Sequence, residues 1–364
     1  MRLHPVGMCV VPLLFLAVFV NVLIIFRYDP TLFSYTEMPF PTSPNRNPNF
    51  TQPTYVGAGI DTRLSNYEGV CQQVFTNEPN NPRDLWLSAI EFTKPGYWQF
   101  IKESVYFTLG LLNSSCPRTT KVLLLMSSPP DDTFVSEMQS FGLQVVRIDV
   151  QFDVPTDAVS RRFFVYKKYL SELVEDTRVA GNRVERYKNY NKILLCDFRD
   201  VYIFADVYAT FSAHEVIFVI ECHTERSGCI GFDEYHNTKW MNSAYGPNVT
   251  RTFVRNNYIV SNGGMMMGGS SKIYRYINIM TNELKPEKMR LWGYDQSVHN
   301  YLLYTGKFDE LNITKEYCTQ RTCFSERVSL VVDFKRKILY TRETGCAPVL
   351  RHKVWNTKLF YSEH

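Results

Sequence analysis

The residues most able to do chemistry lie in one stretch, Lys192-Ile-Leu-Leu-Cys-Asp-Phe-Arg-Asp-Val-Tyr-Ile-Phe204. An apolar run with the length of a buried strand leads directly into Asp197 and Asp200. In an open α/β sheet, ligands bind just beyond the carboxyl ends of the strands. Two carboxylates are costly beside each other unless positive charge lies between them, which Arg199 or a divalent cation could supply. Carboxylate oxygens suit Mg²⁺ or Mn²⁺ that also binds phosphates, and the alternative is a capped turn with a local Arg salt bridge.

Segments with strand and helix patterns alternate along the chain on both sides of this stretch. Strand-like apolar runs cover residues 121–126, 143–149, 192–196, 215–220, 258–267, 328–333 and 337–341. Helical patterns cover residues 97–112, 131–141, 160–175, 271–284 and 295–304. This order predicts an α/β fold, with a mostly parallel sheet and helices on both of its faces. The sequence has neither G-x-G-x-x-G nor a P-loop, so the usual nucleotide-binding fingerprints are absent.

The strand with its two carboxylates resembles the D-x-D segment of GT-A-fold glycosyltransferases, notably the glycogenin and galactinol-synthase type. In that family a Phe follows the second Asp by eleven residues, and Phe211 holds this position relative to Asp200. The resemblance implies a GT-A (Rossmann-like) fold, a nucleotide-sugar donor, and Mn²⁺ or Mg²⁺ bound by Asp200. Asp197 matches the first Asp only after one inserted residue, so it is expected to bind either the metal or the donor ribose. Arg199, between them, is expected to lie at the donor.

Two later segments follow in the order of the family. Val260–Gly268 is similar to its N-x-G strand, which implies that Asn262 hydrogen-bonds the donor sugar. The resemblance also implies that the backbone at Gly263 and Gly264 approaches the donor closely. The alternative for these two glycines is an ordinary β-bulge or turn.

Trp292–Gln296 is similar to the D-Q that opens a helix in the same family. The resemblance implies that Asp295 faces the sugar hydroxyls or the acceptor, with Gln296 at the donor. The alternative for Asp295 is a helix N-cap, which is a common use of this residue type.

The third metal ligand of such enzymes is usually a His near the carboxyl end, which implies His352 in this chain. Arg162, on the helix before the acidic strand, is implied as a contact to the nucleotide phosphates. The alternatives are a structural role for His352 and a solvated helix face around Arg162. Four other histidines match no family position and are expected at the surface or behind the site: His214, His223, His236 and His299.

The amino terminus predicts a membrane anchor. Residues 6–26 are apolar except for Gly7 and Asn21, and this length can cross a bilayer as a helix. We predict a cytoplasmic tail at 1–5 and an uncleaved signal anchor at 6–26, with a cleaved signal peptide as the alternative. Glycosylation sequons at Asn49, Asn113, Asn248 and Asn312 all follow the anchor. They indicate a glycosylated, single-pass type II protein of the Golgi or ER membrane, with its body in the lumen.

Residues 27–83 are predicted to be a stem and lead-in, rich in Pro, Asn, Thr and Ser, and residues 84–364 a catalytic domain. Eight of the nine cysteines follow the anchor, which is compatible with disulfides in an oxidising compartment. Cys222 and Cys229, and likewise Cys318 and Cys323, are close enough to pair. Neither spacing is typical of a zinc ribbon. Cys196, inside an apolar strand, is expected to be a buried free thiol.

Charge and composition exclude other partners. Lys and Arg number 40 against 36 Asp and Glu, and a net charge of +4 does not indicate a nucleic-acid groove. The hydrophobic fraction of 45% is enough for a large core.

We therefore expect a hexosyl- or pentosyltransferase that moves a sugar from a nucleotide sugar to a glycan, glycoprotein or glycolipid acceptor. The resembled family retains anomeric configuration; in an inverting alternative, Asp295 would be the base. Two rival functions remain open: a metal-dependent hydrolase of phosphate esters or glycans, and a non-catalytic, membrane-tethered glycan-binding protein.

Overall fold

The computed structural model describes residues 71–364 except 72, 225–226, 334–337, 355–357 and 362–364. The predicted tail, signal anchor, most of the stem and the sequon at Asn49 lie outside the described residues. Among the residues that are described, no helix is long and apolar enough to span a bilayer.

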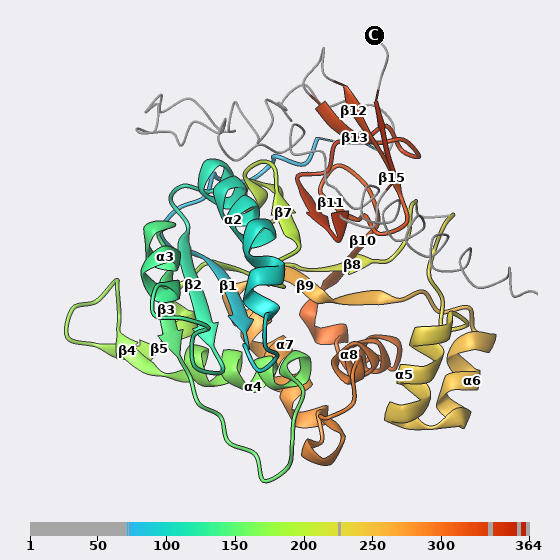
Figure 1. The fold of residues 1–364 in the computed structure, drawn as a ribbon, viewed down its shortest axis with the longest axis horizontal. Helices are drawn as coiled ribbons and strands as arrows, with labels where there is room; N and C mark the ends of the chain where they lie inside the picture. Colours follow the sequence, from blue (N-terminus) through green and yellow to red (C-terminus); the bar gives the residue numbers. More distant parts are fainter. Residues whose placement is uncertain (1–70, 72, 225–226, 334–337, 355–357, 362–364) are drawn as a thin grey trace, which may run out of the picture. The chain divides into compact units, whose positions relative to one another are not determined.

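A seven-stranded sheet forms the centre of the fold, with the order β10-β8-β9-β6-β1-β2-β3 (Figure 1). Its strands are β1 (Asp84–Ile90), β2 (Thr120–Leu125), β3 (Gln144–Arg147), β6 (Lys192–Cys196), β8 (Val216–Ile220), β9 (Ser261–Gly269) and β10 (Ile313–Glu316). β9 runs antiparallel to β6 and β8, and the other neighbours pair in parallel. The predicted mostly parallel sheet is confirmed.

Helices cover both faces of the sheet, as predicted. Side chains alternate between the two faces along each strand, so an apolar strand places apolar side chains on both faces, and helices bury them. Trp86 and Leu123 pack on one side with α2 (Tyr97–Ser115) and α3 (Phe134–Ser140). Leu85 and Leu87 pack on the other side. The helices of that second side are α4 (Ala158–Ser171), α7 (Ser270–Glu283) and α8 (Tyr294–Tyr304).

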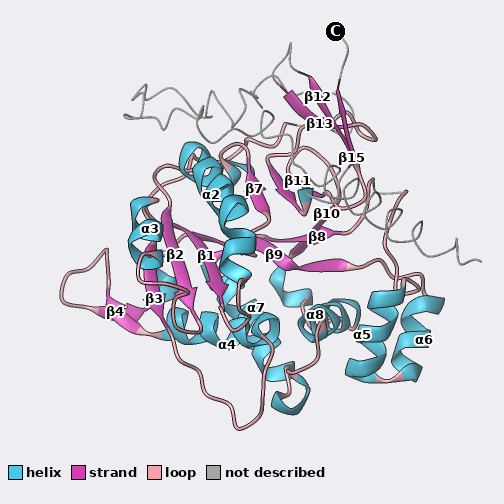
Figure 2. Ribbon diagram, in the orientation of Figure 1, coloured by secondary structure: helices cyan, strands magenta, loops and turns pink. Residues whose placement is uncertain are grey.

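The sequence patterns did not predict two helices, α5 (Tyr235–Tyr245) and α6 (Pro247–Arg255). Helix α5 lies beside α8, and α6 lies on the other side of α5 (Figure 2). Their apolar stripe is narrow: the buried positions of α5 are Asn237, Met241 and Ala244. The helix predicted for 160–175 is too long. It ends at Ser171, and Leu173–Glu175 form β4, which pairs with β5 (Arg183–Glu185).

A small sheet brings the carboxyl-terminal part of the chain to the acidic stretch. β7 (Val201–Ile203) pairs antiparallel with β14 (Leu350–His352), which pairs in parallel with β11 (Thr322–Phe324). In this register His352 lies opposite Val201, the residue after Asp200. A further sheet contains β12 (Ser329–Asp333), β13 (Ile338–Thr341) and β15 (Lys358–Tyr361).

Disulfides hold this carboxyl-terminal part in place. Cys222–Cys229 and Cys318–Cys323 are bonded, which confirms the two predicted pairs. A third bond, Cys71–Cys346, joins the first described residue to the loop before β14. Cys196 is a buried free thiol, as predicted, and Cys116 is another. A cross-link over such a long stretch of chain limits the unfolded ensemble and so stabilises the position of β14.

Candidate active site

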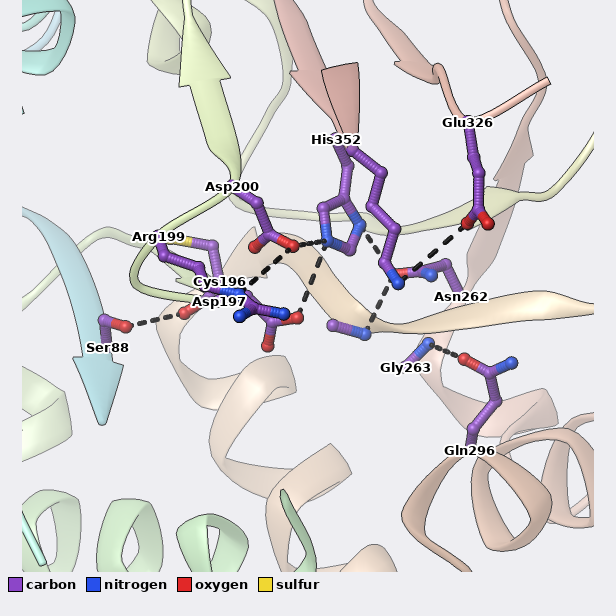
Figure 3. A network of polar contacts seen from close by, with 12 residues as sticks. Ser88, Cys196, Asp197, Arg199, Asp200, Asn262, Gly263, Gln296, Glu326 and His352 are labelled. Carbon is purple, nitrogen blue, oxygen red and sulfur yellow. Dashed lines mark hydrogen bonds and ion pairs between the residues drawn. The ribbon is translucent and has the colours of Figure 1, made fainter. Parts of the chain in front are cut away.

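Asp197, Asp200 and His352 meet at the carboxyl end of β6. Each offers one ligand atom, and these atoms lie within 4.8 Å of one another. The chain extends the sheet from β1 to β2 and β3, and then returns to place β6 on the other side of β1. Such a reversal of strand order is where open α/β sheets bind ligands. Figure 3 shows the three side chains pointing toward one another.

The extra residue in the D-F-R-D segment does not separate the two carboxylates. Phe198 turns into the core, where its ring lies 6.3 Å from the ring of Trp86. The Arg199 carbonyl accepts a hydrogen bond of 2.6 Å from the Ser104 hydroxyl on α2. The packing of Phe198 and the hydrogen bond from Ser104 therefore fix the turn, and both carboxylates project toward the same point.

His352 reaches this point through the pairing of β14 with β7. The backbone N–H of Lys353 donates to the carbonyl of Asp200 at 3.0 Å, which ties the end of β14 to the turn. The imidazole Nε2 lies 3.4 Å from Asp200 Oδ2 and 3.5 Å from Asp197 Oδ2. The side chains of His352 and Asp200 are almost fully buried, whereas that of Asp197 is 29% exposed.

Asn262 sets the tautomer of His352. Its Oδ1 accepts from the N–H of Gly264 at 2.9 Å and lies 3.0 Å from His352 Nδ1. A backbone N–H can only donate, so this oxygen is the acceptor and Nδ1 must carry the proton. The lone pair of a neutral His352 is then on Nε2, which faces the carboxylates. Fixing a ligand through its other nitrogen is the usual support for a metal-binding histidine.

The three residues fit a divalent cation. Asp200 Oδ1 and His352 Nε2 are buried without a hydrogen-bond partner. A Cβ at Gly264 would lie 2.5 Å from Asp197 Oδ2 and 2.8 Å from His352 Cε1, so this glycine leaves open the space next to the ligands. Two carboxylates and one imidazole are a donor set that Mn²⁺ accepts more readily than Mg²⁺, because Mg²⁺ prefers oxygen alone.

The pKa of His352 responds to its carboxylate neighbours. Burial disfavours the imidazolium, but the negative charge of Asp200 and then Asp197 outweighs it and raises the pKa to about 9. Burial likewise disfavours an ionised Asp197, but the positive charges of Arg162 and His352 hold the pKa of that carboxyl below its usual range.

We expect the affinity for Mn²⁺ to rise with pH, because the cation must displace the proton on His352 Nε2. Below about pH 9 one proton is released per ion, so affinity should increase about tenfold per pH unit. The folding stability of the metal-free protein should change with pH in the opposite direction. The charged His352 stabilises the folded state fully below about pH 6.5, and this contribution is lost as the pH rises toward about 9. Calorimetric titration at pH 6.5, 7.25 and 8.0 measures the slope; a flat profile would contradict the assignment of His352.

Arg162, on α4, links the cluster to α8. Its guanidinium donates to Asp197 Oδ1, to Asp295 Oδ2 at 2.9 Å and to the Gly263 carbonyl at 2.9 Å. The group is buried, and the two carboxylates raise its pKa against the effect of burial. Arg162 therefore lies in the site, and its guanidinium is occupied by these two carboxylates and a carbonyl.

Asp295 is buried and paired with Arg162; burial raises its pKa, while the guanidinium opposes the rise. It is not the N-cap of α8, since Gly293 takes that position, which excludes the capping alternative. Gln296 accepts from the N–H of Gly263 at 3.2 Å and donates to Asn237 Oδ1 on α5 at 3.1 Å.

The bulge alternative for the two glycines is correct but does not exclude the site. The register of β8 with β9 jumps from Phe218↔Met266 to Ile220↔Ser261, so Gly263 and Gly264 lie within an irregularity of the sheet. On the other edge of β9 the pairing with β6 stays regular beyond Cys196↔Met265, and the Asp197 N–H donates to the Gly264 carbonyl at 2.8 Å.

Two residues of the site were missed. Glu221 follows β8 as Asp197 follows β6, and its Oε1 accepts from Asn262 Nδ2 at 2.8 Å. Burial raises the pKa of Glu221 to about 7, against the effect of that hydrogen bond. The sequence signal was present: an apolar strand that ends in a carboxylate. Lys353, directly after His352, adopts a left-handed φ of 59°, and its Nζ lies 3.9 Å from Glu326 Oε2.

Arg199 and the other histidines lie around the cluster. The Arg199 Nε is 4.0 Å from Asp200 Oδ2, so a cation does lie beside this carboxylate. His299 is fully buried behind β9, where its Nε2 lies 2.9 Å from the Ser261 hydroxyl, and burial lowers its pKa to about 3. His214 and His236 are exposed, and His223 is half-buried.

Comparisons with known proteins give little beyond this geometry. No protein-family profile matches the chain, and no curated protein matches it. Among solved structures, the glycosyltransferase GlyE of Streptococcus pneumoniae TIGR4 superposes with a TM-score of 0.35 at 13% identity. The match covers 65% of this chain and 45% of GlyE, so the chain spans less than half of that protein. A likeness this distant carries no argument about function.

Proposed function

We propose that this protein is a metal-dependent glycosyltransferase that uses a nucleotide-sugar donor. The observation that carries the proposal is the meeting of Asp197, Asp200 and His352 at the strand-order reversal of a mostly parallel sheet. Two of these residues come from the acidic strand end and the third from more than 150 positions later, yet one small sheet joins them. Their resemblance to the D-x-D and His ligands of GT-A enzymes supplies the reaction class.

The chemistry needed is charge stabilisation at a departing diphosphate. A cation held by Asp197, Asp200 and His352 would supply positive charge that counts most as the glycosidic bond breaks. Arg199 adds positive charge beside Asp200, whereas Lys353, which follows His352, is paired with Glu326.

Retention of configuration is the stereochemistry that we propose. An inverting enzyme needs a free carboxylate base, and the Asp295 carboxylate is buried and bound to Arg162. Asn262 is committed to His352, Gly264 and Glu221, so we propose that it positions the metal ligand, in addition to any contact with the sugar. The type II arrangement, the Golgi or ER membrane and the glycan acceptor are further parts of this proposal.

The two rivals differ from this proposal in measurable ways. A hydrolase would consume a nucleotide sugar or phosphate ester in Mn²⁺ without any acceptor. A glycan-binding protein would bind glycans while Mn²⁺ and nucleotide sugars have no effect on it. The test is a panel of UDP-, GDP- and CMP-sugars titrated into the full-length protein, once in Mn²⁺ and once in EDTA, with binding measured by isothermal titration calorimetry. The proposal expects binding of at least one nucleotide sugar that EDTA abolishes; if none binds, the proposal is wrong.

Gly264→Ala is expected to block the cation site while leaving the backbone unstrained. The new Cβ would lie 2.5 Å from Asp197 Oδ2 and 2.8 Å from His352 Cε1, so a ligand must move. We expect the affinity for Mn²⁺ to fall at least about 100-fold, in line with the loss of a well-placed ligand. Gly142→Ala has open space around it but a left-handed φ of 78°, so it controls for a general loss of stability: it should lower the melting temperature and leave the affinity for Mn²⁺ unchanged. Unchanged Mn²⁺ binding in Gly264→Ala would contradict the site.

A further inference from the structure

A hollow of about 560 Å³ is lined by residues of α5 and of the turn that leads into α8. Helices α5 and α8 lie side by side (Figure 1). Its volume is in the range of small-ligand sites. Residues from both elements line it: Tyr235, His236, Lys239, Trp240, Ser243, Arg290, Leu291 and Trp292. Nothing in the proposed metal and donor site uses these side chains.

The hollow presents large aromatic rings to solvent. Tyr235 is 70% exposed and Trp292 is 56% exposed, whereas most large aromatic side chains of the fold are buried. Trp240 is held in place, because its ring packs directly on Gly293: a Cβ there would lie 2.2 Å from the ring. Exposed aromatic rings gathered around a hollow indicate a binding surface more than a packing defect.

The charge of the hollow is positive. Lys239 and Arg290 line it, both are exposed, and no acidic residue is among its lining residues. Within the described residues, neither has an ion-pair partner within 4.0 Å. Lys94 adds a third cation, 5.9 Å above the ring of Trp292. A ligand with negative charge therefore matches this surface.

Helix α5 and the turn before α8 connect the hollow to the candidate active site. Asn237, on α5, accepts a hydrogen bond from Gln296, whose other amide atom accepts from the N–H of Gly263. Trp292 precedes Asp295 by three residues in the same turn. A molecule in the hollow would therefore contact the same helix and turn that carry Asn237 and Asp295.

We propose that this hollow is a subsite for the acceptor, and that the acceptor is a glycan bearing a carboxylate, sulfate or phosphate group. The inference rests on the proposed glycosyl transfer and adds the acceptor's chemical class. Trp292 and Tyr235 offer flat apolar faces to the C–H face of a sugar ring, at low entropic cost because each has two side-chain torsions. Lys239 and Arg290 pair with the anionic group, and Arg suits carboxylate, sulfate and phosphate oxygens alike.

The test is direct binding of matched acidic and neutral saccharides to the full-length protein. The probes are sialyllactose compared with lactose, and a chondroitin sulfate tetrasaccharide compared with chitotetraose. Calorimetry and tryptophan fluorescence measure the binding of each probe. We expect an acidic probe to bind at least about tenfold more tightly than its neutral counterpart, with the difference shrinking in high salt. EDTA is present and nucleotide sugar is absent, so the result does not depend on metal-dependent transfer.

Variants locate the binding. Trp292→Ala should weaken binding of the acidic probe about tenfold. The double variant Lys239→Ala/Arg290→Ala should bind acidic and neutral saccharides equally well. Two exposed residues outside the hollow serve as controls: Leu173 on β4, which is 53% exposed, and Lys307 after α8. Leu173→Ala and Lys307→Ala should change neither the affinity for the acidic probe nor the difference between acidic and neutral probes. In a transfer assay, Trp292→Ala should raise the KM for the acceptor and leave the KM for the nucleotide sugar unchanged.

Three results would overturn the inference. One is equal binding of acidic and neutral saccharides, or no binding of either. Another is acidic binding that Trp292→Ala and the double charge variant leave unchanged. The third is tight binding to phosphatidylserine vesicles that the acidic saccharides do not displace, since the surface would then be a lipid contact. Metal-dependent binding of nucleotide sugars could persist in each case, so the proposed function would be judged separately.

Discussion

Asp200→Asn and His352→Ala are each expected to lower transfer at least about 1,000-fold while the domain stays folded. Asp200 and His352 face one another at 3.4 Å, and each has a buried atom without a hydrogen-bond partner. His352→Ala leaves a site with two donors, and Asp200→Asn replaces an anionic oxygen with a neutral one, so either change leaves too little to hold a divalent cation firmly against water. The loss should appear in kcat with any nucleotide sugar that the wild type accepts, and in Mn²⁺ affinity measured by calorimetry.

The folded state of these variants is checked independently. Asp200→Asn removes a charge that faces another carboxylate, so we expect the melting temperature without metal to change by only a few degrees. Lys307→Ala, an exposed substitution distant in sequence from all three ligands, should match the wild type in melting temperature and turnover. Either ligand variant turning over at a near wild-type rate in Mn²⁺ would make the metal assignment wrong.

Arg162→Met is expected to cost about 3–5 kcal/mol of folding free energy as well as activity. The guanidinium is buried and neutralises Asp197 and Asp295 together, so its loss leaves two carboxylates without their cation. For a chain of this size the cost corresponds to a fall in melting temperature of roughly 5–8 °C. Denaturant unfolding followed by circular dichroism measures it.

The pH dependence and a second substitution separate charge from packing. Without Arg162, burial raises the pKa of Asp295 in the folded state, so the variant should lose stability as the pH rises above about 4. The deficit relative to wild type should therefore be smaller at pH 4.5 than at pH 7.5. Arg162→Met combined with Asp295→Leu should recover part of the stability but none of the activity. A deficit that is the same at both pH values would contradict the charge explanation.

The sequence predicted five of the seven strands of the central sheet, because these have a strong local signal, and it missed β1 and β10. A strand buried on both faces, such as β6, is a continuous apolar run, and its predicted bounds coincide with Lys192–Cys196. Helices with narrow apolar stripes have a weak signal, which is why α5 and α6 were missed. The helix predicted beyond Ser171 continued over Leu173–Glu175, because hydrophobic spacing alone does not distinguish a short hairpin strand from one more helical turn.

The candidate site was predicted in part, and the reasons differ by residue. The two aspartates have a local signal, a strand that ends in carboxylates. His352 could be named only through a family resemblance, since its approach to Asp200 depends on the pairing of β14 with β7. The partners of Asn262 and Arg162 were not predictable, because both side chains are held by groups from distant elements. The bond between Cys71 and Cys346 was equally non-local.

Pulsed electron paramagnetic resonance of Mn²⁺ bound to the full-length protein tests the central claim most directly. The account predicts one tightly bound ion whose echo modulation includes coupling to a single ¹⁴N nucleus, the Nε2 of His352. His352→Gln should abolish this coupling, and Asp200→Asn should release the ion. Tightly bound Mn²⁺ with no nitrogen coupling, or with a coupling that survives in His352→Gln, would contradict the account.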